Sequence, residues 1–372
     1  MKKKMSFAEL NNEVLFNKNN KKIIWQPRIL AWYWDKMYTK EPLPAPYTGM
    51  TLPQIHREIN ASARIYEYGL AYKISEHPKV YRTERMLNET DKEITIHTPV
   101  GKQVAIQRSS PNNSYVIHLK WEVSTEEELK VATWREENTT WEWNQAGFDQ
   151  IAAEWGDLGA PCMIIPRVNV QSLYLDRMGS VNGIYAIYDW KDTVEAYFRA
   201  LDRRDEMIIK VVNKSPIKIV NFGDNVHCGT LPPDIFKKYV LPAYQKRCDM
   251  LHTAGKFVYA HWDGDTGALL PYAHETGLDG IEAITPKPQG DVTLEQIKEG
   301  LGDDIFFIDG IPAVYFDHTY PESDLIECTH RLIELFAPKL VLGISDEISS
   351  HGDIERCRIV GKIVEEYNSQ FD

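Results

Sequence analysis

Six short apolar runs in the second half of the chain alternate with amphipathic segments, and this alternation limits the fold more than any other feature. The runs are CMIIP from Cys162, IKIVNF from Ile217, KFVYAH from Lys256, DGIEAI from Asp279, IFFIDG from Ile305 and LVLGIS from Leu340. Apolar runs separated by helical segments are typical of strand–helix units in a parallel sheet. An earlier run, IIWQP at residues 23–27, predicts a seventh strand.

The segments between the runs have the spacing of amphipathic helices. In residues 232–255 one helical face carries the apolar side chains of Ile235, Phe236, Tyr239, Val240, Ala243 and Tyr244. Pro233 predicts the start of this helix and Gly255 its end. Seven or eight such units favour an α/β fold of the (β/α)8 TIM-barrel type, with an open doubly wound sheet as the alternative. The eighth strand is predicted in GIYAIYDW, from Gly183, or in an irregular segment.

Residues 30–150 differ from this pattern and are interpreted as an elaboration between the first two strands. Residues 93–109 alternate polar and apolar side chains around a Val-Gly-Lys turn, which predicts a β-hairpin outside the barrel. A helix is predicted from about Pro53. Because no linker or low-complexity tract sets this part off, residues 1–372 are predicted to form one domain that carries an insertion.

Composition and charge narrow the range of partners. The formal net charge of -12 argues against nucleic acid, because binding phosphate requires a basic face. No stretch approaches the roughly 20 apolar residues of a membrane helix, and the lysines at residues 2–4 precede no apolar run of a signal peptide. The five cysteines are scattered and lack CxxC pairing. These features predict a cytoplasmic protein without a membrane or nucleic-acid partner.

Polar residues follow each apolar run, and in a parallel barrel the carboxyl ends of the strands meet at one mouth, where catalytic groups collect. The residues at these predicted ends are Pro166, Arg167, Asn169, Asn221, Asp224, Asn225, His227, His261, Asp263, Asp265, Glu282, Asp309, Asp346 and Glu347. A strand that ends in a polar loop needs no function to explain it, so any single residue of this set is weak support for a site.

His261 and Glu282 stand out because apolar residues flank both. If they point into the barrel they need a partner, since a buried unpaired charge is costly. A divalent metal would satisfy that need, and imidazole and carboxylate are usual ligands of zinc. The spacing His261-Trp262-Asp263 is compatible with two ligands from one strand end. The alternative is a hydrogen-bonded histidine with solvated Asp263 and Asp265.

Aromatic residues form a second cluster just after the first strand, where ILAWYWDKMY contains Trp32, Tyr33 and Trp34. Such density is typical of core or lid packing, but aromatic side chains also line ligand pockets. Other site types lack support in the sequence. It contains no GxxxxGK[ST] loop, no GxGxxG after a strand and no GxSxG elbow.

From about Cys162 onward, the order of these blocks resembles the uroporphyrinogen decarboxylase superfamily. The matching blocks are LPPDIFKKYVLPAYQKRCDMLHTAGKFVYAHWDGD, ETGLDGIEAITPKPQGDVTLEQIKEGLGDDIFFIDGIP and LVLGISDEI. The resemblance implies a (β/α)8 barrel and one of two activities: decarboxylation of tetrapyrroles, or methyl transfer that involves a corrinoid protein.

Two departures from the family pattern bear on the choice between these branches. The decarboxylases carry paired arginines after the first strand, whereas WQPRILAWYW offers only Arg28. The methyltransferases bind zinc through His-x-Cys and a later cysteine, and here His261-Trp262-Asp263 and Asp346 stand at the similar places. Oxygen ligands in place of thiolates suit an oxygen-containing substrate better than a thiol.

The WQPR opening and the segment PYTGMTLPQIHREINASARIYEYG look most like the branch that demethylates methoxylated compounds. That resemblance implies an O-demethylase methyltransferase, which passes a methyl group from an aryl methyl ether to Co(I) of a separate corrinoid protein. The chain has no DxHxxG motif of its own for cobalamin. The implied partners are therefore a corrinoid-binding protein, which carries the cobalamin, and a small aromatic methyl ether.

The resemblance also implies roles for the candidate residues. His261, Asp263 and Glu282 are expected to bind a metal, with zinc as the candidate, and Asp346 is expected to act as a further ligand or as an acid. His261, Asp346 and Asp224 form the expected catalytic set. The expected substrate-binding residues are Trp32, Tyr33, Arg28, Asn221 and His227.

Two alternatives stay open at this point. A decarboxylase of a carboxylated aromatic or tetrapyrrole would release carbon dioxide without a second protein. A non-catalytic binding protein would show no turnover, and alanine at His261 would leave its ligand affinity unchanged. The sequence does not indicate which methoxylated compound is used or whether the chain forms a homodimer.

Overall fold

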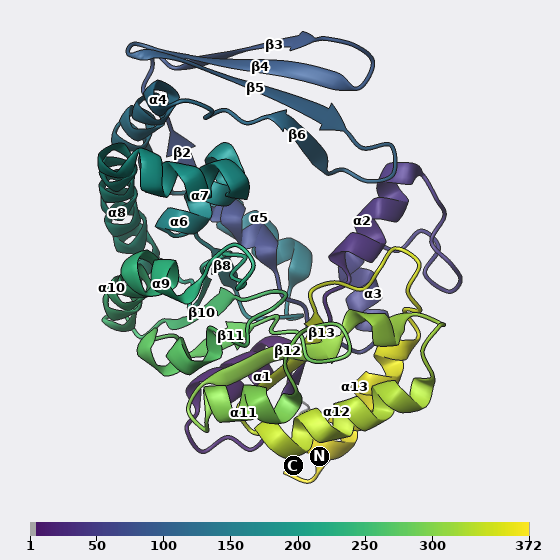
Figure 1. Ribbon diagram of the computed structural model, residues 1–372. Coiled ribbons are helices and arrows are strands. Elements are labelled where there is room, and N and C mark those ends of the chain that lie inside the picture. Colours follow the sequence, from purple (N-terminus) through teal and green to yellow (C-terminus); the bar gives the residue numbers. More distant parts are fainter. Residues whose placement is uncertain (1–4, 372) are drawn as a thin grey trace.

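The computed structural model describes residues 5–371, and the lysine cluster at residues 2–4 lies outside the described residues. Its main feature is a curled sheet of seven parallel strands (Figure 1). The strand order is β1-β13-β12-β11-β10-β9-β8. The strands are β1 (Ile24–Trp25), β8 (Cys162–Ile164), β9 (Ile219–Asn221), β10 (Phe257–His261), β11 (Gly280–Glu282), β12 (Phe306–Pro312) and β13 (Leu340–Ser345). Six of them lie within the predicted runs and β12 extends two residues beyond its run, so the seven strand predictions are confirmed.

Helices alternate with the strands and cover the outside of the sheet (Figure 1). They are α6 (Asn169–Ser172), η2 (Leu173–Met178), α7 (Ser180–Asp189), α8 (Lys191–Asn213), α9 (Pro233–Ile235), η3 (Phe236–Val240), α10 (Leu241–His252), η4 (Leu270–Glu275), α11 (Leu294–Leu301), η5 (Ala313–Phe316), α12 (Glu322–Phe336) and α13 (Arg356–Ser369). The predicted helix start at Pro233 is confirmed, and Gly255 follows α10 with a left-handed φ of 65°. This alternation is that of a TIM-barrel-like fold.

Between β1 and β8 the structure has an irregular segment, residues 61–65, in place of a strand. Its backbone bonds to both sides, because the Ser62 N–H donates to the Trp25 carbonyl at 3.0 Å and the Ala63 N–H donates to the Leu158 carbonyl at 2.8 Å. The strand predicted in GIYAIYDW is wrong, since residues 183–189 lie in α7. The buried residues Gly183, Ala186 and Ile187 follow helical spacing.

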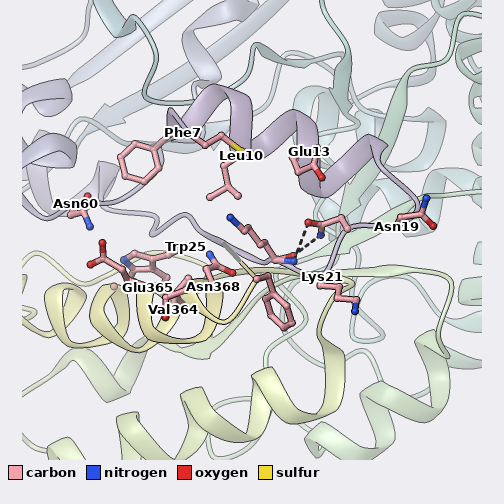
Figure 2. A pocket seen from close by; sticks show the side chains of 16 residues that line it. Phe7, Leu10, Glu13, Asn19, Lys21, Trp25, Asn60, Val364, Glu365 and Asn368 are labelled. Atoms are coloured by element: carbon pink, nitrogen blue, oxygen red, sulfur yellow. Dashed lines mark hydrogen bonds between the residues drawn. The ribbon is translucent and has the colours of Figure 1, made fainter. Parts of the chain in front are cut away.

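The amino-terminal end of the sheet is covered by α1 (Phe7–Phe16). Val14 packs in one buried cluster with residues from six strands, among them Ile24 and Phe257. Beside this helix lies a cavity of about 780 Å³, lined by α1, the segment that leads into β1, and α13 (Figure 2). Because residues 19–22 of its lining precede β1, this cavity lies at the end of the sheet opposite the carboxyl ends of the strands.

The elements between α2 and β8 form two small antiparallel sheets and several helices. They are α2 (Leu30–Thr39), α3 (Leu52–Glu58), η1 (Tyr66–Ala71), β2 (Tyr72–Ser75), β3 (Tyr81–Met86), β4 (Asp91–Thr98), β5 (Gly101–Ser109), β6 (Val116–Lys120), α4 (Glu126–Glu137), β7 (Thr140–Trp143) and α5 (Gln145–Trp155). The predicted hairpin is confirmed as β4 and β5, which belong to the four-stranded sheet β3-β4-β5-β6. Within residues 5–371, no helix has both the length and the apolarity to cross a membrane.

Candidate functional site

One imidazole and two carboxylate side chains lie close together at the carboxyl ends of the strands. β10 ends at His261, Asp263 follows two residues later, and Asp346 directly follows β13. One ligand atom from each of these three residues lies within 4.8 Å of the others, a spacing that can hold a metal ion. The donor set of one imidazole and two carboxylates is suited to zinc and leaves a position for another ligand.

Glu282, the predicted third ligand, lies behind His261 at the end of β11 and is only 1% exposed. Its Oε2 atom is 2.9 Å from His261 Nδ1 and accepts a hydrogen bond from Asn221 Nδ2 at 3.0 Å. Its Oε1 atom accepts from Tyr66 Oη at 3.0 Å and from the Arg64 guanidinium. Protein groups thus occupy both carboxylate oxygens.

This environment keeps the Glu282 carboxyl charged. Burial raises its pKa, but the positive charge of Arg64 and the hydrogen bond from His261 outweigh burial and hold the pKa well below its usual range. A charged carboxylate only accepts hydrogen bonds, so His261 donates its Nδ1–H to Glu282 and directs Nε2 away from it. A carboxylate that orients a ligating histidine in this way is a usual partner in metal sites.

Arg64 links the acidic residues below the mouth. Its Nη2 donates to Asp309 Oδ1 at 2.8 Å, and its Nε donates to Gln26 Oε1 at 3.1 Å. Arg64 and Asp309 are buried, and burial raises the pKa of Asp309 despite the opposing charge of Arg64. Arg64 and Gln26 were not predicted, although Arg64 carries the signal used for Glu282, a charged residue flanked by apolar ones.

Arg28, a predicted substrate-binding residue, lies at the mouth among carboxylates. Its Nη1 is 3.3 Å from Asp346 Oδ1 and 3.5 Å from His261 Nδ1, and its Nε is 3.4 Å from Glu347 Oε1. Glu347 also accepts a hydrogen bond from the Ala31 N–H at 3.3 Å, at the start of α2. Arg28 therefore fixes the loop after β13 and holds Asp346 beside His261.

Three residues with strained backbone conformations lie in this part of the sheet. Ala283, Asp309 and Asp346 have φ values of 68°, 81° and 63°, in the left-handed region that residues with a Cβ rarely adopt. Ala283 and Asp346 directly follow β11 and β13, and Asp309 lies in the middle of the neighbouring strand β12. Strain of this kind persists only where surrounding contacts fix it, and it is concentrated at functional sites.

Of the other predicted residues, Asn221 bonds to the site through Glu282, whereas Asp224 and His227 bond to other residues. Asn221 is 1% exposed and bonds to Glu282 and, at 2.6 Å, to the Gly223 N–H. Asp224 accepts from the Val168 N–H at 3.0 Å and from Tyr244 Oη at 2.8 Å, and burial raises its pKa to about 6. His227 pairs with Thr230 at 3.2 Å.

The predicted aromatic residues Trp32 and Tyr33 lie on α2 and expose little of their surface. Trp32 is 1% exposed and packs in the core against Tyr47, and Tyr33 is also buried. On the same helix, Trp34 is 51% exposed and is the tryptophan of α2 that faces solvent.

The inserted four-stranded sheet lies across the end of the molecule toward which the strands point, from α4 to α2 (Figure 1). Contacts fix it at both sides. On one side Tyr38 Oη of α2 donates to the Ser110 carbonyl at 3.0 Å. On the other, the Val123 N–H donates to the Arg177 carbonyl at 3.1 Å, and the Arg177 guanidinium pairs with Glu122.

No protein-family model and no curated protein sequence matches the chain. Among solved structures, a methyltransferase from Methanosarcina mazei has a similar fold, with a TM-score of 0.57, 11% identity and coverage of 98% of this chain and 99% of that chain. A B12-independent methionine synthase from Shewanella sp. W3-18-1 has a TM-score of 0.44, 8% identity and coverage of 85% and 86%. The similarity to the Methanosarcina mazei structure is one of fold, and it covers nearly the whole chain.

Proposed function

We propose that this protein is a methyltransferase that removes the methyl group of a methoxylated aromatic compound and transfers it to Co(I) of a separate corrinoid protein. The observation that carries the proposal is the convergence of His261, Asp263 and Asp346 at the carboxyl ends of the strands. The fold shared with the Methanosarcina mazei methyltransferase supports methyl transfer as the reaction class.

The three side chains fit a zinc ion because they offer one nitrogen and two oxygen donors within a small space. When bound, the metal would supply Lewis-acid polarisation of the ether oxygen. Nitrogen and oxygen donors make a harder site than thiolates, which suits an ether oxygen. Within the chain, Glu282 orients His261 and Arg28 holds Asp346, so both contacts preorganise the donor set.

In the proposed reaction, the bond between the methyl carbon and the ether oxygen breaks, and its electron pair stays on the oxygen. The two electrons of Co(I) form the new cobalt–carbon bond, which gives methyl-Co(III) on the carrier protein. The phenolate takes up a proton and leaves as the phenol. Phenolate is a poor leaving group, so polarisation of the oxygen lowers the barrier.

Decarboxylation is the second candidate, and Arg28 at the mouth is the observation that favours it. A decarboxylase needs free cationic groups to bind substrate carboxylates. Arg28 lies within 3.4 Å of carboxylate oxygens of both Asp346 and Glu347, and Arg64 is held by Glu282 and Asp309. Because protein carboxylates already pair with both arginines, methyl transfer is the better-supported function.

The test is methyl transfer from a panel of methoxybenzenes and methoxybenzoates to a reduced corrinoid protein, followed by cobalamin absorbance with and without a chelator. We expect methyl-Co(III) to form, and we expect a chelator or His261→Ala to abolish its formation. The matched control is Asp265→Asn, an exposed acid on the same loop outside the group of three. Carbon dioxide release by the isolated protein, with no spectral change, would favour the decarboxylase instead.

A further inference from the structure

The loop between β5 and β6, residues 110–115, is tied to the candidate site through α2. Tyr38 near the end of this helix bonds to the Ser110 carbonyl, while the Ala31 N–H near its start bonds to Glu347. In the middle of the helix, the Asp35 carboxylate accepts a hydrogen bond from Ser350. One short helix thus connects the loop that carries Asp346 and Glu347 with the loop of the inserted sheet.

Tyr115 ends this second loop and has a defined backbone position. Its N–H donates to Asn113 Oδ1 at 3.1 Å, and its carbonyl accepts from the Ser110 N–H at 3.3 Å. Its side chain is nevertheless 66% exposed, so the protein leaves most of the ring uncovered. A fixed backbone with an uncovered aromatic ring is available for contact with a ligand at low entropic cost.

The Tyr115 phenol is within electrostatic range of charged groups at the mouth. Partial burial and the carboxylates of Glu347, Asp35 and Asp346 raise the pKa of Tyr115, while the Arg28 guanidinium lowers it. These are charged groups of the mouth and of α2. The contacts of Tyr38 with Ser110 and of Ala31 with Glu347 place the loop and the mouth at the two ends of this one short helix.

We propose that Tyr115 is a substrate-binding residue that packs against the aromatic ring of the methyl donor and restricts the site to aryl methyl ethers. This inference rests on the proposed function and adds to it the side chain that selects the substrate. It replaces the expectation that Trp32 supplies this contact, because the Trp32 ring is in the core. A ring carried by the insertion also gives that insertion a function.

The experiment measures binding of dimethoxybenzene and methoxybenzoate to the isolated full-length protein by calorimetry, which needs no corrinoid protein. We expect Tyr115→Ala to raise the dissociation constant about tenfold, because an aromatic contact is lost, and Tyr115→Phe to stay close to the wild type. The matched control is Tyr81→Ala, since Tyr81 is 58% exposed on the outer strand of the same sheet. Zinc binding by each variant verifies that the site is intact.

The outcomes separate this inference from the proposed function. Binding that Tyr115→Ala weakens, without methyl transfer by the wild type, would reject the methyltransferase and leave the role of Tyr115 standing. Equal affinities of wild type and Tyr115→Ala, equal losses in Tyr115→Ala and Tyr81→Ala, or no binding of either ether to the wild type would each overturn the inference.

Discussion

Glu282 Oε2 lies 2.9 Å from His261 Nδ1, and this contact determines which nitrogen of His261 remains for a ligand. The four donors around Glu282 all point at a carboxylate, because Asn221 and His261 share Oε2 while Arg64 and Tyr66 share Oε1. An amide at this position would direct its NH2 group at two donors. This arrangement of four donors therefore requires a carboxylate at position 282.

The first prediction concerns Glu282→Gln. We expect this variant to bind zinc about 10- to 100-fold more weakly than the wild type, because the orientation of His261 is lost. A competition titration with a chromophoric chelator measures the affinity. The control is Glu299→Gln at an exposed position of α11. Unchanged zinc affinity in Glu282→Gln would show that this contact does not orient a metal ligand.

The second prediction concerns the buried charge of Arg64. Arg64→Met leaves Glu282 and Asp309 without their main cation, and breaking a buried pair in this way costs about 3–5 kcal/mol. Urea unfolding measures the loss. Arg331→Met is the control, because Arg331 pairs with Glu295 and Glu334 at the surface, where such pairs contribute less than about 1 kcal/mol. Similar losses in both variants would contradict this reasoning.

The sequence allowed prediction of the parts of the site that follow apolar strands. His261, Glu282 and Asp346 were found because a run of buried residues precedes each of them, and the mouth of a parallel barrel brings such positions together. Arg64 was missed although apolar residues flank it as they flank Glu282, and Gln26 was missed although it directly follows the apolar residues of the first run. Arg64 lies in an irregular stretch that has no periodic pattern.

Contacts between distant segments explain what the sequence did not predict elsewhere in the fold. GIYAIYDW has a short apolar pattern that suits a strand or a helix, and packing against α8 and η2 selects the helix α7. The β-hairpin was predicted from local alternation, but its position over the mouth depends on contacts such as Tyr38 with Ser110, which lie far apart in the sequence.

The third prediction concerns Gly343 in β13. A Cβ atom at this position would lie 2.3 Å from Asp309 Oδ1 and 2.9 Å from the Gln26 carbonyl. We expect Gly343→Ala to displace Asp309 from Arg64 and to lower the free energy of unfolding by about 1–3 kcal/mol, as overpacking does. Chemical unfolding measures the change. Gly69→Ala is the control, because a Cβ there meets no atom within 4 Å, and an equal loss in that variant would refute the explanation.

The fourth prediction concerns the dependence of stability on pH through His56. This residue of α3 is 4% exposed beside Trp155, and burial lowers its pKa from 6.5 to about 4. Between these two values the unfolded chain binds a proton that the folded protein does not. The contribution of His56 to stability is therefore lost as the pH falls from 6.5 to 4, by about 3 kcal/mol in total.

The variant His56→Leu isolates this contribution. The wild type loses stability as the pH is lowered from 7 to 4, whereas the leucine binds no proton in either state. The free energy of unfolding of His56→Leu should therefore increase relative to that of the wild type over this range. Urea unfolding at several pH values gives the difference. His330→Gln, at an exposed position of α12, controls for the removal of one histidine. A difference between His56→Leu and wild type that is constant over this range would show that His56 is not the buried neutral histidine described above.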